Sequence, residues 1–428
     1  MLAMQWQLER SQWWQPELIL EQQFRQVRAL AAHALANVPF YGDALRPTGL
    51  PDAGRLTPDA FRRWPVLRKA DVRASEAKLQ AAHYPKEHGA VGETYTTGST
   101  GTPLRIIQTQ AAEFFSHAMV IRDHLLHERD FNLKYAAIRS QPGASPVSGW
   151  GLPNAMFRTG PGRALDLVND VDTQLDWLLA ERPGYLLSYP TNLRALVLRS
   201  RELGRLPEGL VHLIAFGEML PPDLRALARE HWNVPVVDAY SCQEVGAIAS
   251  QCPGHEHYLV HAENLYVEIL REDGAPCAPG EIGEVVITAL HNFAMPLIRY
   301  AIGDYAEAGA RCPTGRGLPV LHRVVGRVRN MLRDPTGRTR WPSFPGKFWY
   351  AIAPFRQIRL VQHTLSEIEV QYACERALTE GEHERIVSML NERLGYPFGI
   401  RFTRLEQIAR ARNEKWEDFV SLLPPSQA

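Results

Sequence analysis

Helical segments and short strand-like runs alternate through the middle of the chain, and this alternation constrains the fold more than any other feature. Apolar residues at helical spacing predict helices over residues 16–38, 108–129, 172–181, 190–203 and 221–231. Runs of β-branched and apolar residues predict strands over residues 185–188, 211–215, 234–238, 266–270 and 284–288. Strands that alternate with helices imply an α/β core.

The pattern changes near residues 326–330. Beyond this point strand-like runs at 358–362 and 368–372 precede a strongly helical segment at 380–394 and a further strand-like run at 400–405. A chain of 428 residues is too long for one comfortable hydrophobic core, and the last hundred or so residues are enough for a small domain. We therefore expect a large domain over residues 1–330 and a small one over residues 331–428.

Charge and cysteine usage exclude several classes of protein. Lys plus Arg and Asp plus Glu both number 47, so the chain has no net charge with which to grip a polyanion, and nucleic acid is not an expected partner. Five cysteines are an odd number in a large chain and do not indicate a disulfide framework. The sequence shows no signal-peptide pattern and no apolar run long enough for a membrane span, so the cytoplasm is the expected location and no membrane is expected as a partner.

A loop rich in glycine and hydroxyl residues, Tyr95-Thr-Thr-Gly-Ser-Thr-Gly-Thr-Pro-Leu104, precedes a predicted strand. Glycine allows tight turns, and successive N–H groups together with Ser and Thr hydroxyls can surround phosphate oxygens. The loop is not a Walker A motif, because no Lys follows the last glycine as G-x-x-x-x-G-K-[ST] requires. The alternative is a surface linker.

Two further segments place polar residues just after apolar strands. In Val236-Val-Asp-Ala-Tyr-Ser-Cys-Gln-Glu-Val-Gly246, Tyr240 can stack on a base and Glu244 can hold a cation. The alternative is a strand end with a solvated Glu. In Met295-Pro-Leu-Ile-Arg-Tyr-Ala-Ile-Gly-Asp304, which follows a buried strand near residues 284–290, the carboxylate of Asp304 suits a pair of ribose hydroxyls; by itself it could be a turn residue.

These three segments, in this order, resemble the adenylate-forming superfamily of acyl-CoA synthetases and related ligases. The phenylacetate–CoA ligase branch, which includes CapK-type proteins, is indicated by Pro39-Phe-Tyr41, Trp64-Pro-Val-Leu-Arg-Lys69 and Met295-Pro-Leu-Ile-Arg-Tyr300. The likeness runs from about residue 25 to the C-terminus. It implies an α/β fold with a large N-terminal adenylate-forming domain of mixed sheets and helices, and a small mobile α+β C-terminal domain.

The resemblance also assigns site residues. The phosphate loop falls on Thr96, Thr97, Gly98, Ser99, Thr100 and Gly101. The other nucleotide-binding positions fall on Gly217 and Glu218 near the adenine, Tyr240 against the base with Ser241 next to it in the sequence, and Asp304 and Arg327 at the ribose. Glu244 matches the magnesium ligand, Asn330 the hinge, and Lys415 the catalytic Lys of the small domain.

Three positions depart from the family pattern. Thr102 stands where relatives usually carry a Lys in the phosphate loop, so one positive charge is missing there. Asn330 replaces the usual acidic hinge residue, although Asn tolerates unusual backbone angles and can still act as a pivot. Lys415 follows Glu414 instead of a glycine, and the alternative for it is a solvated Lys near Arg410 and Arg412.

The activity implied is ATP- and magnesium-dependent activation of a carboxylic acid, an aryl or other small organic acid. Such an enzyme forms an acyl-adenylate, releases pyrophosphate and passes the acyl group to CoA. One alternative acceptor is an amine or a carrier-protein thiol. A non-catalytic nucleotide-binding scaffold is a second alternative, and a homodimer is left open as the assembly.

A cluster of metal-binding residue types stands apart from the nucleotide motifs. Its members are Cys252, His255, His257, His261 and Cys312. Thiols and imidazoles suit structural zinc, and CapK-type relatives often carry Cys and His near these positions, with a further Cys where Thr314 stands here. Ordinary loop histidines and a free buried Cys are the alternative.

Overall fold

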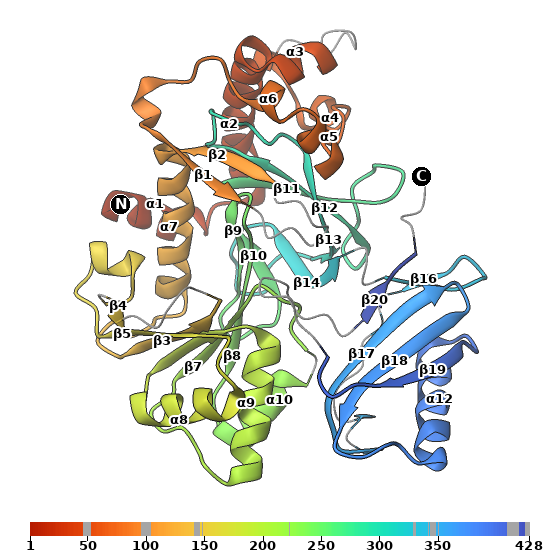
Figure 1. Ribbon diagram of the computed structural model, residues 1–428. Coiled ribbons are helices and arrows are strands. Elements are labelled where there is room, and N and C mark those ends of the chain that lie inside the picture. The colour runs from red at the N-terminus through yellow and green to blue at the C-terminus, as the bar shows by residue number, and fades with distance from the viewer. Residues whose placement is uncertain are drawn as a thin grey trace. The chain divides into compact units, whose positions relative to one another are not determined.

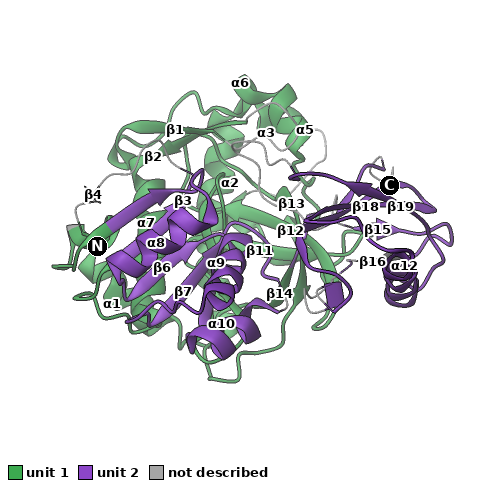
Figure 2. Cartoon of the chain, turned by 60° about the horizontal axis from the view of Figure 1, so that its bottom comes forward, with its two compact units in different colours: residues 1–134, 147–162, 238–324 green, residues 135–146, 163–237, 325–428 purple. Residues whose placement is uncertain are grey.

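The computed structural model describes residues 1–45, 53–95, 104–140, 146–147, 149–221, 223–327, 331–340, 342, 348–349, 351–408 and 419–423 (Figure 1). The chain divides into two compact units, which Figure 2 colours separately. The first comprises residues 1–134, 147–162 and 238–324, and the second residues 135–146, 163–237 and 325–428. Among the helices described, none combines the length and the apolar character that a membrane span requires.

The helices of the first unit lie mostly in its N-terminal half. They are α1 (Leu2–Ser11), α2 (Pro16–Asn37), α3 (Pro39–Leu45), α4 (Pro58–Phe61), α5 (Lys69–Ala74), α6 (Glu76–Leu79) and α7 (Gln110–Leu126), with short 3-10 turns at Ala53–Arg55, Lys86–His88 and Leu152–Ala155. Helix α2 begins at Pro16, as predicted, because proline fits a first turn that needs no N–H donor. It buries the stripe Phe24, Val27, Ala31 and Ala34 in the main core.

Seven neighbouring strands lie wholly or mainly in the first unit. In sheet order they are β11 (Leu265–Leu270), β12 (Ile282–Ala289), β13 (Tyr300–Ala308), β14 (Val320–Arg327), β10 (Tyr258–Val260), β9 (Gly246–Gln251) and β8 (Val236–Cys242). A separate antiparallel pair, β1 (Val91–Tyr95) and β2 (Arg105–Thr109), brackets the glycine-rich loop. Strands predicted over 266–270 and 284–288 are therefore present as β11 and β12.

The second unit begins with parallel strands and covering helices. Its strands are β3 (Tyr135–Arg139), β4 (Pro146–Val147), β5 (Gly162–Asp166), β6 (Tyr185–Ser188) and β7 (His212–Phe216), and its helices are α8 (Val171–Glu181), α9 (Pro190–Leu203) and α10 (Leu224–Trp232). Strands β3, β6 and β7 run parallel, which requires helical crossovers between them. Leucine and valine side chains from both layers form one buried cluster.

The C-terminal part contains β15 (Leu332–Arg333), β16 (Thr339–Arg340), β17 (Phe355–Thr364), β18 (Glu367–Cys374), α12 (Glu380–Leu394), β19 (Gly399–Arg404) and β20 (Phe419–Ser421). It has the predicted β-β-α-β order in β17, β18, α12 and β19, with the short pair β15–β16 before it and β20 after it. Its four-stranded sheet has the order β19-β18-β17-β20. The described residues of its hydrophobic core all lie between Leu332 and Phe419 in the sequence. A capping box between Thr379 and Glu382 starts α12. The domain boundary at residue 330 stays a prediction.

The three segments that indicate the phenylacetate–CoA ligase branch meet in the first unit. The Tyr41 hydroxyl donates to Pro296 O at 2.8 Å and accepts from Ile298 N at 3.1 Å. Leu67 pairs with the start of β13, because its N–H donates to Arg299 O at 2.9 Å and its carbonyl accepts from Ala301 N at 3.0 Å. These hydrogen bonds join the three motifs in one part of the first unit.

A buried ion pair fixes the centre of this junction. Arg299 has a φ of 50°, a left-handed conformation that a side chain with a Cβ rarely adopts. Its guanidinium donates to both Glu268 carboxylate oxygens, at 2.9 and 3.1 Å, and to the carbonyls of Arg62 and Trp64. The Arg299 and Glu268 side chains are only 3% and 5% exposed. Burial raises the pKa of Glu268 although the guanidinium opposes this, so the carboxylate depends on Arg299 to stay charged.

We therefore predict that Arg299→Met lowers the free energy of unfolding by about 3–5 kcal/mol, because it leaves a buried carboxylate unpaired. Urea unfolding followed by circular dichroism measures the change. Arg271→Met is the matched control, since Arg271 pairs with Asp273 on the surface, and such exposed pairs contribute only about 0–1 kcal/mol. Equal losses in the two variants would contradict the role given to the buried pair.

Candidate active site

Tyr240 and Asp304, which the sequence places in separate motifs, are in contact. The Tyr240 hydroxyl donates to Asp304 Oδ2 at 2.9 Å. Strands β8 and β13 are separated by three strands in the sheet, a spacing of roughly 19 Å if the sheet were flat. The contact therefore requires the sheet of the first unit to curl until β8 faces β13.

A bulge in β13 gives Asp304 its position. The partners Glu284↔Tyr305 and Val286↔Ala301 leave one residue of β12 opposite three residues of β13, residues 302–304. Gly303 has a φ of 85°, which glycine adopts without steric cost. Because of these extra residues, Asp304 lies outside the regular pairing of β12 and β13, and its carboxylate accepts the hydrogen bond from Tyr240.

Glu244 lies at the tip of the β8–β9 hairpin, only four residues after Tyr240. Cys242 pairs with Gly246 across the turn, and Ser241 pairs with Ala247 beside a bulge. The Glu244 carbonyl accepts from Gln108 Nε2 at 2.9 Å, which ties the turn to β2, the strand that follows the glycine-rich loop. Glu244 is 8% exposed. The turn therefore carries a buried carboxylate and is hydrogen-bonded to β2.

Among the residues that the structure describes, Tyr300 and Lys69 face the Glu244 carboxylate. The Tyr300 hydroxyl donates to Oε1 at 3.4 Å, and Lys69 Nζ lies 4.0 Å from the same oxygen. Burial raises the pKa of the Tyr300 phenol, and the charge on Glu244 adds to this, so the phenol keeps its proton and remains a donor. The motif that contains Tyr300 can be recognised in the sequence, but no feature of the motif indicates that the Tyr300 hydroxyl reaches Glu244.

Gly217 and Glu218 lie at the end of β7 in the second unit. Gly217 has a φ of 79°, and a Cβ there would lie 3.2 Å from the Tyr189 ring. The Glu218 carboxylate accepts from the Thr191 N–H at 3.2 Å and from its hydroxyl at 2.6 Å, so it caps the start of α9. Tyr189 also stacks on Phe216, with ring centroids 4.7 Å apart. Sequence reasoning missed this capping role and the aromatic pair.

Several predicted residues lie outside the described parts of the chain. These are Thr96, Thr97, Gly98, Ser99, Thr100 and Gly101, together with Thr102, Asn330 and Lys415. The residues that flank the loop are described: Tyr95 pairs directly with Arg105 across β1 and β2. Arg327 is the last residue of β14.

The structure brings three of the five predicted metal ligands together. The Cys252 and Cys312 sulfurs lie 3.8 Å apart, and His257 Nε2 lies 3.2 Å from the Cys312 sulfur. All three ligand atoms lie within 4.8 Å of one another. Burial, with Cys312 close by, raises the pKa of Cys252 to about 11, so a metal would have to displace a thiol proton.

The other two histidines differ from each other. His261 lies apart from these ligands, because its Nε2 is 3.3 Å from Ser250 Oγ and its ring is fully buried. His255 is exposed, and its ring centroid lies 5.2 Å from that of His257. Of the two, His255 is the one with a recorded contact to a member of the cluster, because its ring neighbours that of His257.

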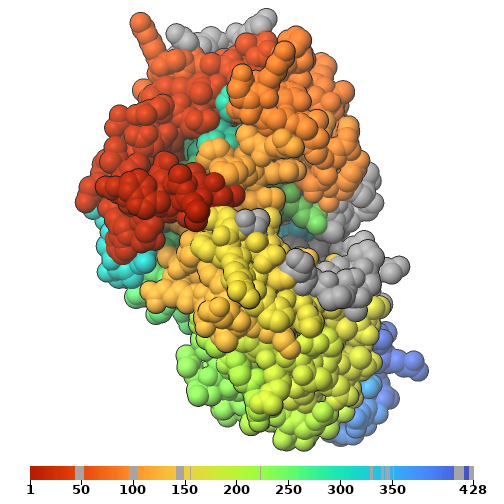
Figure 3. Space-filling view, turned by 90° about the vertical axis from the view of Figure 1, so that its left-hand side faces the viewer, coloured from red at the N-terminus to blue at the C-terminus, as the bar shows by residue number. Residues whose placement is uncertain are grey.

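The N-terminal segment supports the turn that carries Cys312. Arg316 Nε donates to Gln12 Oε1 at 2.8 Å, and the Gly317 N–H donates to Gln12 O at 2.8 Å. The Arg316 guanidinium also lies 4.4 Å from the centre of the Trp13 ring. N-terminal residues, red in Figure 3, form part of the surface on this side of the molecule.

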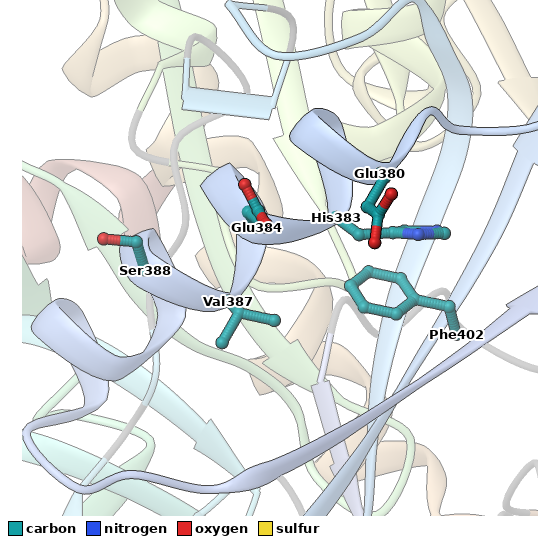
Figure 4. Close-up of a pocket in the computed structure, with 6 residues that line it drawn as sticks. All are labelled: Glu380, His383, Glu384, Val387, Ser388 and Phe402. Carbon is teal, nitrogen blue, oxygen red and sulfur yellow. The ribbon is translucent and has the colours of Figure 1, made fainter.

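A shallow pocket in the C-terminal part involves none of the predicted site residues. It is lined by Glu380, His383, Glu384, Val387 and Ser388 of α12 and by Phe402 of β19 (Figure 4). The His383 ring packs on Phe402, with centroids 4.2 Å apart. This contact helps to seat α12 on the sheet.

Comparisons with known proteins show which proteins the chain resembles. No family model matches the chain. A phenylacetate–CoA ligase of Thermus thermophilus is 23% identical over 328 residues, which cover 72% of this chain and 70% of the relative. The phenylacetate–CoA ligase of Escherichia coli K12 is 25% identical over 318 residues, covering 70% and 69%.

Solved structures show the same fold. A 2-hydroxyisobutyryl-CoA ligase in the postadenylation state superposes with a TM-score of 0.72 at 18% identity, covering 93% of this chain and 88% of that one. The anthranilate CoA ligase AuaEII, in complex with anthranoyl-AMP, gives a TM-score of 0.57 at 16% identity, covering 76% and 64%.

These similarities confirm the predicted α/β fold and identify the class: an AMP-forming ligase of the adenylate-forming superfamily. Within that class the chain is a relative of the phenylacetate–CoA ligases, as the three branch segments predicted.

Proposed function

We propose that this chain uses ATP and magnesium to convert a small organic acid, such as an aryl acid, into an acyl-adenylate, and then transfers the acyl group to CoA. The contact between Tyr240 and Asp304, with Glu244 four residues further along the chain, is the observation that carries the proposal. The contact joins an aromatic ring to a carboxylate suited to ribose hydroxyls, and Glu244 offers a further carboxylate suited to a cation; these groups support the proposal.

In the first half-reaction, ATP would be held along its whole length. Residues 96–101 would bind the phosphates, Tyr240 would stack on the base and Asp304 would bind the ribose. The further nucleotide-binding positions that the resemblance assigns are Ser241, Gly217, Glu218 and Arg327. Glu244 would hold magnesium, which offsets charge on the departing pyrophosphate. Lys415 bridges the acid carboxylate and the α-phosphate, so that the carboxylate oxygen attacks the α-phosphorus and the bond to pyrophosphate breaks.

In the second half-reaction, the small domain over residues 331–428 rotates near Asn330 and withdraws Lys415, which opens a path for the acceptor. Support for CoA comes from a structural neighbour, the 2-hydroxyisobutyryl-CoA ligase, which was solved in complex with 2-HIB-AMP and CoA. An amine or a carrier-protein thiol is the alternative acceptor. A non-catalytic scaffold is disfavoured, because Tyr240, Asp304 and Glu244 keep a coherent arrangement.

We also propose a structural zinc site at Cys252, His257 and Cys312, which would be completed by His255. The observation that favours it is that the ligand atoms of two thiols and one imidazole lie within 4.8 Å of one another. The turn that carries two of these residues is closed by a hydrogen bond from the Cys252 N–H to His257 O. Zinc accepts such ligands in tetrahedral geometry. A closed site of this kind would tie the end of β9 to the segment that precedes β14, without taking part in the reaction.

The proposed function predicts pyrophosphate release that depends on an added acid, measured across a panel of aryl and short-chain acids with and without CoA. Glu244→Gln should slow this release roughly a hundredfold or more, because a preorganised charge at the leaving group is lost. The exposed Glu272→Gln is the control and should leave the rate unchanged. No acid-dependent release by the wild-type protein would contradict the function, and a wild-type rate in Glu244→Gln would contradict the role of Glu244.

The zinc proposal predicts about one equivalent of zinc in the purified protein, by elemental analysis, with loss of the metal and a lower melting temperature in Cys252→Ser and Cys312→Ser. Cys277→Ser should keep the metal, because Cys277 lies in the loop between β11 and β12, outside the ligand cluster. A metal-free wild-type protein, with an unchanged melting temperature in Cys252→Ser, would show these residues to be ordinary loop side chains.

A further inference from the structure

Among the described strands, β1 and β2 form a sheet of their own, so no backbone ladder joins them to the large sheet (Figure 1, orange). Apolar packing holds the pair on the first unit, since Ile106 and Ile107 of β2 are buried in its main core. Hydrophobic contact has no preferred direction, whereas a hydrogen bond fixes both a distance and an angle. The orientation of these two strands, which bracket the glycine-rich loop, therefore depends on hydrogen bonds to the rest of the unit.

The amide side chains of Gln108 and Asn292 link β2 to two other parts of the first unit. Gln108 Nε2 donates to the Glu244 carbonyl at 2.9 Å. Asn292 Nδ2 donates to the Ile107 carbonyl at 2.8 Å and to the Met295 carbonyl at 3.0 Å, and Asn292 is buried. Asn292 thus ties β2 to the segment before β13, and Gln108 ties it to the β8–β9 turn.

The hydrogen bond from Gln108 is not what closes either of the elements that it joins. Cys242 already pairs with Gly246 across the β8–β9 turn, and Gln108 itself pairs with Gly92 of β1. The side chains of Gln108 and Ile106 lie on the same face of β2, and Ile106 is fully buried, so Gln108 extends from a fixed strand. The bond therefore sets the distance between the strand that follows the loop and the residue proposed to hold magnesium.

We propose that Gln108 is a positioning residue that holds the glycine-rich loop and Glu244 at the separation that one MgATP molecule requires. The inference rests on the proposed function and deepens it by naming a residue that joins both phosphate-binding elements. Magnesium on Glu244 and the donors of the loop must meet the same triphosphate, and a displacement of about 1 Å can cost as much as a hundredfold in rate. AMP lacks the β- and γ-phosphates, so its binding through Tyr240 and Asp304 would not depend on this separation.

Calorimetric titration of the whole protein with MgATP and with AMP tests the role of Gln108. Gln108→Met removes the amide donor and keeps the length of the side chain. Its dissociation constant for MgATP should rise roughly threefold to tenfold, the loss expected for one hydrogen bond between neutral groups, while AMP binds as it does to the wild type.

Gln26→Met is the matched control. Gln26 of α2 also donates from Nε2 to a backbone carbonyl, that of Leu290 at 3.2 Å, so both variants lose a hydrogen bond of the same kind. Gln26→Met should leave both nucleotide affinities unchanged. If Gln108→Met weakens MgATP and AMP equally, or changes neither affinity, the inference is wrong.

A double variant tests whether Gln108 acts through Glu244. In the Glu244→Gln background, Gln108→Met should change the MgATP affinity by less than about twofold, because the magnesium ligand that Gln108 positions is already lost. A loss as large as that in the wild-type background would overturn the inference. A wild-type protein that binds neither nucleotide would instead contradict the proposed function.

Discussion

The buried pair between Arg299 and Glu268 is the interaction on which the candidate site of the first unit depends. Arg299 adopts a left-handed backbone conformation at the start of β13 while it pairs with Glu268. Its guanidinium also donates hydrogen bonds to the backbone carbonyls of Arg62 and Trp64, in the segment that precedes Leu67. That segment leads into α5, and β13 continues to Tyr300 and Asp304. A buried charge is stable only when it is paired. The pairing of the Glu268 carboxylate with Arg299 therefore also fixes the positions of α5 and β13.

Curvature of the sheet is the second constraint, because it brings residues of β8 and β13 into contact. Tyr240 and Asp304 meet although three strands lie between β8 and β13, and the bulge at Gly303 provides the local freedom for that contact. Glu244 then follows from the short hairpin after Tyr240, since a tight turn leaves few positions for its side chain. The proposed chemistry therefore depends on how the backbones of β8 and β13 bring these side chains together, more than on a deep pocket.

Much of the fold could be predicted from the sequence, because hydrophobic periodicity is a local signal. Helices α2, α8, α9 and α12 lie where the apolar spacing placed them. Side-chain partners were harder to predict. The motif that contains Arg299 was recognised, yet its left-handed backbone and its pairing with Glu268 depend on distant residues. Glu218 is predicted to lie near the adenine, and its contact with Thr191 at the start of α9 could not be read from the motif. Spacing alone could not decide which histidine joins the two cysteines.

The most direct test of the account follows the carboxylate oxygen. The acid that gives the fastest pyrophosphate release is labelled with 18O in its carboxylate and turned over with ATP, magnesium and CoA, and the nucleotide product is examined by mass spectrometry. Attack of the carboxylate on the α-phosphorus forms an acyl-adenylate, and cleavage of its acyl C–O bond by the thiol leaves one labelled oxygen in AMP. The account predicts labelled AMP and unlabelled pyrophosphate. Unlabelled AMP, or ADP with label in the released phosphate, would contradict it.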